Sequence, residues 1–183
     1  LMITPTSVRM FGWILSATQV AAMSDTQILA MGLSDAAVAA LTPAQVAALN
    51  PAQLRAISAT QLGALTTAQI GGLTTEQIGA LTTTQVAAVE TTDIAALSTT
   101  QIGGLSTGQI GALTTSQVQA IETTGIAALS ATQIGALSSA QVAALGTNQV
   151  SAIEASDIAA LNATQVAAFT ATQVGALTTT QIK

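Results

Sequence analysis

The chain of 183 residues contains no cysteine, no histidine and no tyrosine. Without Cys and His it cannot form a disulfide framework, a zinc site of the usual kind or a Ser-His-Asp triad. Its three basic residues are too few for a phosphate-binding face, so we expect no nucleic-acid partner. Since no nucleophile–base pair is evident either, we expect neither enzymatic activity nor a cofactor.

Charge and aromatic rings are also scarce, at 6% and 2% of residues, where a typical soluble domain has about 25% charged residues. Half of the residues are apolar and the mean hydropathy is +0.61, values unlike those of a disordered chain. No apolar stretch reaches the roughly 18 residues that a transmembrane helix needs. So little charge predicts poor solubility for an isolated monomer, and it therefore favours assembly.

An octapeptide repeat accounts for this composition. From Leu15 the chain divides into 21 blocks of eight, with one two-residue insert at Met31 and Gly32 and a shortened last block, LTTTQIK. Position 1 is apolar and usually Leu, position 6 is Val, Ile or Leu, and position 8 is Ala or Gly. Positions 2 to 5 most often read [ST]-x-x-Q, so each block pairs two apolar columns with a polar segment.

A second period of 32 residues lies on the first. Position 1 is β-branched at Ile57, Val89, Ile121 and Ile153, and the last three of these residues open the acidic blocks VETTDIAA, IETTGIAA and IEASDIAA. Four octads therefore form a higher-order unit.

The spacing of the apolar positions favours helices over strands. Position 6 and the next position 1 are three residues apart, which places them on one face of a helix but on opposite faces of a strand. A helix continued through the blocks would rotate its apolar stripe by about 80° per octad, and no straight neighbour could follow it. The pattern therefore predicts one short helix in each octad.

The polar half of the block supplies the start signal for such a helix. With Ser or Thr of position 2 at the N-cap, Gln of position 5 becomes N3 of a capping box, and positions 1 and 6 form a hydrophobic staple. Fourteen blocks carry the full S/T-x-x-Q, and Pro43 and Pro51 fall on N1, which tolerates proline. We assign Gln to this capping role on the outer surface, in preference to a ladder of stacked Gln side chains.

Helices this short are unstable alone, so they must stack on neighbours as in a solenoid. We predict an all-α solenoid over residues 15–183, with about four octads (32 residues) per superhelical turn. The alternative is a β-solenoid, because Thr, Val and Ile favour strands. Residues 1–14 lie outside the repeat and form either an N-terminal cap or a joining segment.

Two sets of residues are candidates for function. Phe11, Trp13 and Ile14 would join subunits by packing on the uncapped end around Phe169 and Leu177. The pairs Glu90/Asp93 and Glu154/Asp157 are candidate metal ligands at i, i+3. The alternative role of these acids is to stabilise a helix N-terminus, and we favour it because Gly125 replaces the Asp in the middle block.

The consensus L-[ST]-x-x-Q-[IV]-x-[AG] resembles the tandem octapeptide repeats of long bacterial surface and secreted proteins of the adhesin type. The resemblance implies an extracellular or cell-surface, non-enzymatic protein. We expect a structural subunit of a filament or appendage that assembles with itself, head to tail. The alternatives are an adhesin stalk or spacer and, because of the regular Thr array, an ice-binding repeat protein.

Overall fold

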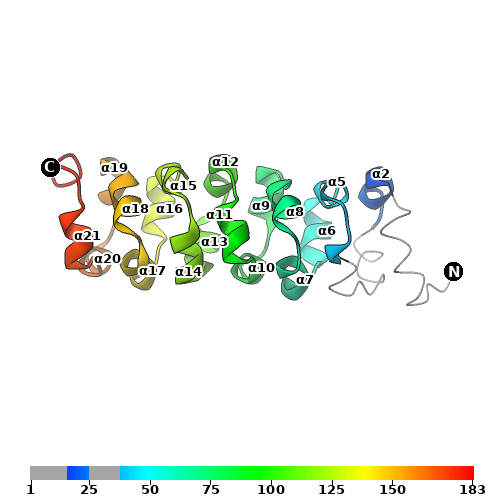
Figure 1. Cartoon of the computed structure of the whole chain (residues 1–183), viewed down its shortest axis with the longest axis horizontal. Helices are drawn as coiled ribbons and strands as arrows, with labels where there is room; N and C mark the ends of the chain where they lie inside the picture. The colour runs from blue at the N-terminus through cyan, green and yellow to red at the C-terminus, as the bar shows by residue number, and fades with distance from the viewer. Residues whose placement is uncertain (1–15, 25–37) are drawn as a thin grey trace. The chain divides into compact units, whose positions relative to one another are not determined.

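The computed structural model describes residues 16–24 and 38–183, and these residues form short α-helices joined by tight turns (Figure 1). One helix forms in each complete octad from Leu41 to Ala176, the shortened last block forms turns, and the described residues contain no strand. The predicted all-α repeat is therefore confirmed and the β-solenoid alternative is wrong. Residues 1–14 fall outside the described residues, so their role as a cap or joining segment stays a prediction.

The chain divides into two units, residues 1–93 and 94–183. The helices described in the first unit are α2 (Ala17–Ala21), α5 (Pro43–Ala47), α6 (Pro51–Ala56), α7 (Ala59–Gly63), α8 (Thr67–Gly71), α9 (Thr75–Ala80) and α10 (Thr83–Ala88). Helix α11 (Thr91–Ala95) lies at the boundary between the units. The second unit contains α12 (Thr99–Gly103), α13 (Thr107–Ala112), α14 (Thr115–Ala120), α15 (Thr123–Ala127), α16 (Ala131–Gly135), α17 (Ser139–Ala144), α18 (Thr147–Ala152), α19 (Ala155–Ile158), α20 (Ala163–Ala167) and α21 (Ala171–Gly175).

The capping box starts these helices, as the sequence predicts. At α17, the Ser138 Oγ accepts a hydrogen bond from the Gln141 backbone N–H, and the Gln141 Oε1 accepts one from the Ser138 N–H. Pro43 occupies N1 of α5 behind the N-cap Thr42. Each helix then ends because the next Ser or Thr must be extended to cap the next helix; Ser138, for example, has φ −71° and ψ 160°.

Within each unit, the helices stack on the helix three places later along the chain, for example α7 on α10 and α15 on α18. This stacking buries both apolar columns. Position-6 residues from Val38 to Val150 are 0–2% exposed, and position-1 residues from Leu49 to Ile153 are at most 9% exposed. The core of each unit is thus a narrow column of Leu, Ile and Val.

Hydrogen bonds between turns show that the coil is tighter than predicted. The glutamine amides bond to backbone carbonyls that lie mostly 28 to 31 residues earlier, between three and four octads, whereas the sequence predicts about 32 residues per turn. The 32-residue period instead reappears in helix length, because pairs of five-residue helices alternate with pairs of six-residue helices from α7 to α18. Ile57, Val89, Ile121 and Ile153 each end a six-residue helix in an extended conformation, which β-branched residues favour.

Candidate assembly surface

The glutamine of position 5 is buried in most of the described octads, which corrects its predicted place on the outer surface. Gln53, Gln69, Gln109, Gln117 and Gln141 are 0–2% exposed. A buried amide must satisfy both its acceptor and its donors, because an unpaired polar group inside a protein costs free energy. The capping box satisfies the Oε1 acceptor alone, so the Nε2 donors need partners elsewhere.

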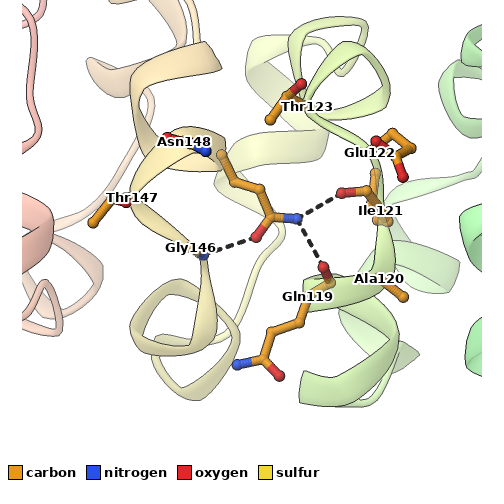
Figure 2. Close-up of a pocket in the computed structure, with 9 residues that line it drawn as sticks. Gln119, Ala120, Ile121, Glu122, Thr123, Gly146, Thr147 and Asn148 are labelled. Atoms are coloured by element: carbon orange, nitrogen blue, oxygen red, sulfur yellow. Dashed lines mark hydrogen bonds between the residues drawn. The ribbon is translucent and has the colours of Figure 1, made fainter.

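Those donors reach the end of a helix in the preceding turn of the coil. The Gln141 Nε2 donates to the carbonyl oxygen of Ile110 at 2.8 Å and to that of Leu113 at 2.7 Å. The Gln149 Nε2 donates to the carbonyls of Ile121 and Gln119, while the Gln149 Oε1 accepts from the Gly146 N–H (Figure 2). We call this arrangement the glutamine clasp: one side chain caps the start of its own helix and the end of another.

The clasp explains how such short helices persist. The last carbonyls of any α-helix lack partners within the helix, and in a helix of five or six residues they are a large share of its backbone groups. The clasp supplies donors to the carbonyls of position 6 and of the following position 1. The two-residue insert moves the clasp accordingly, since Gln53 bonds to Val20, 33 residues earlier, in place of the usual 31.

The acidic blocks interrupt the clasp. Asp93 and Asp157 occupy the position of the clasp glutamine and are buried, at 4% and 8% exposure. An aspartate has no amide N–H to donate, and each one instead accepts a hydrogen bond from a hydroxyl: Asp93 from Thr67 Oγ1 at 2.6 Å and Asp157 from Ser156 Oγ at 3.2 Å. At α15 and α19, within the described chain, the N-cap glutamates make no side-chain cap.

The acidic pairs therefore separate into two environments. Glu90 and Glu154 lie exposed at the start of a block, whereas Asp93 and Asp157 are buried. In the part of the chain that the structure describes, no three Asp or Glu residues come together as a group that could hold a metal ion. The assignment of these four residues as metal ligands therefore stays a prediction. Among the described residues, no further acidic side chain joins either pair to make a group of three.

Apolar side chains become exposed at the last turn of the second unit. Val166 and Val174 of α20 and α21 are 50% and 53% exposed, and Ile182 is 66% exposed. All three occupy position 6, which is 0–2% exposed from Val38 to Val150 and half-buried at Ile158. Position 6 is buried by a following turn of the coil, so the exposed face is the surface on which a further turn would pack.

The predicted joining residues meet this face only in part. Phe169 and Leu177 lie beside it and are half-buried, while Phe11, Trp13 and Ile14 fall outside the described residues. Sequence reasoning missed Val166, Val174 and Ile182, although the signal was present: they belong to the column that every earlier turn covers.

A hollow of about 310 Å³ lies over one clasp, lined by residues 119–123 and 146–149 (Figure 2). Its floor includes the Gln149 amide, whose bonds are directed to the backbone of both helices. Glu122 supplies the charged group of the lining. Separately, no helix in the described part of the chain has the length and apolar character needed to cross a membrane.

Short capped helices, repeated in tandem and stacked on the preceding turns through buried glutamines, define an all-α solenoid of the tandem-repeat class. A family model for the ALTTAQ repeat matches the chain in six overlapping segments: 38–75, 46–83, 61–91, 86–123, 118–152 and 150–183. The chain therefore belongs to the ALTTAQ repeat family. No curated protein and no solved structure matches it.

Proposed function

We propose that the chain is a structural, non-enzymatic subunit of an extracellular filament or cell-surface appendage that assembles with itself end to end. The observation that carries this proposal is the exposure of Val166 and Val174, at 50% and 53%, in a column that is otherwise 0–2% exposed from Val38 to Val150. An apolar surface that interrupts an otherwise buried column is a typical site of association.

The exposed side chains of Val166, Val174 and Ile182 are apolar surface that association would bury. Full burial of a Val or Ile side chain contributes about 1.5–3 kcal/mol, so three half-exposed side chains leave a substantial driving force unused. The surrounding surface carries little charge to oppose contact, since charged residues are 6% of the chain. A contact between two different ends gives an open filament when its rotation does not close into a ring.

The location outside the cell rests on the resemblance of the octapeptide to adhesin-type surface repeats. A solenoid of this kind acts mechanically, as a spacer or a rod element. Its Thr and Ser side chains at position 2 cap helices. This proposal assigns no reaction to the chain.

Sedimentation velocity of the purified chain across a wide concentration range tests the proposal, with electron microscopy of the concentrated sample. We expect species larger than a monomer that grow with concentration. The V174D variant places a charge on the exposed apolar face and should stay monomeric. The matched control is T172D, which adds the same charge at an exposed position of the same helix and should assemble like the parent chain. Circular dichroism establishes that both variants retain their helices.

The alternative function is an adhesin stalk, in which further octads of one polypeptide cover the exposed face. The internal repetition of the clasp favours it, because any octad run of the same pattern fits the same surface. A chain that stays monomeric at every concentration contradicts the filament subunit and supports the stalk.

A further inference from the structure

We infer that position 7 of the octad is a second site of bonding between turns of the coil, which we call the position-7 latch. In a latch, a side-chain donor at position 7 of one helix bonds to the carbonyl at the C-terminal end of the helix three places later. Arg55 forms one latch in the first unit and Ser151 forms another in the second. The latch acts within a single chain, so it is independent of the assembly proposed above.

The two latches join the same pair of positions. The Arg55 Nε donates to the Ala80 carbonyl at 2.7 Å, and the Ser151 Oγ donates to the Ala176 carbonyl at 2.8 Å. Each acceptor occupies position 8 and lies 25 residues after its donor. The Ser151 Oγ also lies 3.0 Å from the Thr147 carbonyl oxygen of its own helix, so the contact between turns is the shorter of its two. A guanidinium and a hydroxyl have little in common except a donor, so the position determines the contact.

Glycines at position 7 show that the same geometry recurs without a donor. A Cβ on Gly63 would lie 2.6 Å from the carbonyl oxygen of Ala88, again 25 residues later. A Cβ on Gly111 or on Gly135 would lie 3.3 Å from the equivalent carbonyl oxygen. An Oγ is one bond beyond the Cβ, so a serine at such a position has a backbone acceptor within hydrogen-bond distance. Position 7 therefore faces the end of a later helix in both units.

The latch complements the glutamine clasp. The last carbonyls of an α-helix have no partner within the helix. The clasp supplies donors to the carbonyls of position 6 and of the following position 1 in the preceding turn, whereas the latch supplies a donor to position 8 in the following turn. A helix that carries both is bonded to the turns on either side. Gly and Ala, which occupy most position-7 sites, bring no side-chain donor, so these turns should separate more readily than those at Arg55 and Ser151.

A polar side chain at position 7 is not sufficient by itself. Gln119 occupies this position, yet its side chain lines the hollow over the neighbouring clasp (Figure 2). Within the described chain, the Gln119 amide makes no bond to a carbonyl of the following turn. A serine is the more direct test of the latch, because its hydroxyl lies on the Cβ and cannot extend away from the carbonyl as a long amide side chain can.

A serine placed at another position 7 tests the inference by gain. Ala143 is an exposed residue at position 7 of α17, and the carbonyl 25 residues later belongs to Ala168, the C-cap of α20, which packs on α17. We expect A143S to raise the hydrogen-exchange protection of the α20 amides by about fivefold, the effect of one net hydrogen bond. The control A140S adds the same hydroxyl at an exposed position of α17 outside the latch and should leave the protection of α20 unchanged.

Removal of the natural latches should give the opposite change. S151A should lower the protection of the α21 amides by about fivefold, although alanine is the better helix former. R55M keeps a long apolar side chain without the Nε donor and should lower the protection of α9. The control S116A removes an exposed helical hydroxyl outside the latch and should not lower the protection of α17, on which α14 packs.

Exchange is measured for all variants at one dilute concentration, so that association does not contribute to protection. Equal effects of A143S and A140S on α20, or an α21 that is as protected in S151A as in the parent chain, would contradict the latch. Neither result bears on the filament proposal, which sedimentation of the parent chain tests separately.

Discussion

A buried glutamine that serves two helices is the residue on which the repeat depends. In Gln141 the amide oxygen caps α17 and the amide nitrogen bonds to the carbonyls of Ile110 and Leu113. The variant Q141E keeps the capping acceptor and removes both donors. We expect it to lower the free energy of unfolding by about 3 kcal/mol, because two buried carbonyls lose their partners and face a carboxylate.

Chemical denaturation followed by circular dichroism measures this loss. The matched variant Q119E introduces the same charge at an exposed side chain and should change stability by less than about 0.5 kcal/mol. Equal effects at the two positions would mean that the added charge, and not the clasp, determines stability.

Glycine at position 7 has a different role from one octad to the next. A Cβ on Gly63 would lie 2.6 Å from the Ala88 carbonyl oxygen, whereas a Cβ on Gly71 would meet nothing within 4 Å. We expect G63A to destabilise the chain by about 1–3 kcal/mol through this backbone clash. G71A should stabilise it by up to about 0.5–1 kcal/mol, because alanine favours the helix. Denaturant midpoints of the two variants should therefore move in opposite directions from that of the parent chain, and a shift of both the same way contradicts the assignment.

At the scale of the element, each helix is so short that its N-cap is a large part of its stability. The Ser138 Oγ accepts from the Gln141 N–H at 3.2 Å, and S138A should cost about 1 kcal/mol. The N-cap of α18 is Gly146, with φ −69° and room for a side chain, since the nearest atom to an added Cβ is the Gln149 Oε1 at 3.5 Å. G146S should therefore gain a few tenths of a kcal/mol to about 1 kcal/mol. Thermal unfolding of both variants provides the comparison, and a loss of stability in G146S would count against capping as the determinant.

The acidic octad that forms α19 is built without either half of the standard cap. Helix α19 has four residues, the N-cap Glu154 makes no side-chain bond within the described chain, and Asp157 replaces the clasp glutamine. Restoring the consensus in the double variant E154T/D157Q should supply a cap and a clasp directed to the carbonyls of Ile126 and Leu129. We expect a gain of about 1–3 kcal/mol.

Hydrogen exchange of the α19 amides gives the local readout for this gain. Protection should increase in α19 and in α16, the helix on which it packs. The single variant E154T, which restores the cap without the clasp, should raise the protection of α19 alone. Unchanged protection in the double variant would mean that Asp157 is already as favourable there as glutamine.

At the scale of the whole molecule, the sequence predicted the elements better than the contacts between them. The capping box and staple fixed where each helix begins, because those signals act within five residues, and Pro43 at N1 agrees with them. The second role of glutamine could not be read in the same way, since its donors act on carbonyls that lie about 30 residues earlier. The number of octads per turn could not be read from the sequence for the same reason. The 32-residue period corresponds to the alternation of helix lengths, whereas the number of octads per turn depends on how the helices pack.

The sequence contains a signal for the exposed face at α20 and α21, but this signal cannot be recognised within a single octad. Phe169 and Leu177 were predicted as joining residues because they are large and apolar, yet they are half-buried. The smaller Val166 and Val174 are more exposed. Exposure there depends on whether a later turn is present, which is a property of the column and not of the residue. The acidic pairs likewise separate in burial, because the N-cap position faces solvent and the clasp position faces the preceding turn.

Assembly and stability should be linked, because an end that is covered by a second copy unfolds less readily. A partner that binds the folded state stabilises it by an amount that grows with concentration, about 1.4 kcal/mol for each tenfold increase once binding is strong. For a chain of this size that corresponds to a rise of a few degrees in Tm per tenfold increase in concentration. The V174D chain, whose exposed face carries a charge, should unfold at a Tm that is independent of concentration, and T172D should behave like the parent. Differential scanning calorimetry over a dilution series measures all three, and a constant Tm for the parent chain would show that its exposed column is not covered by a second copy.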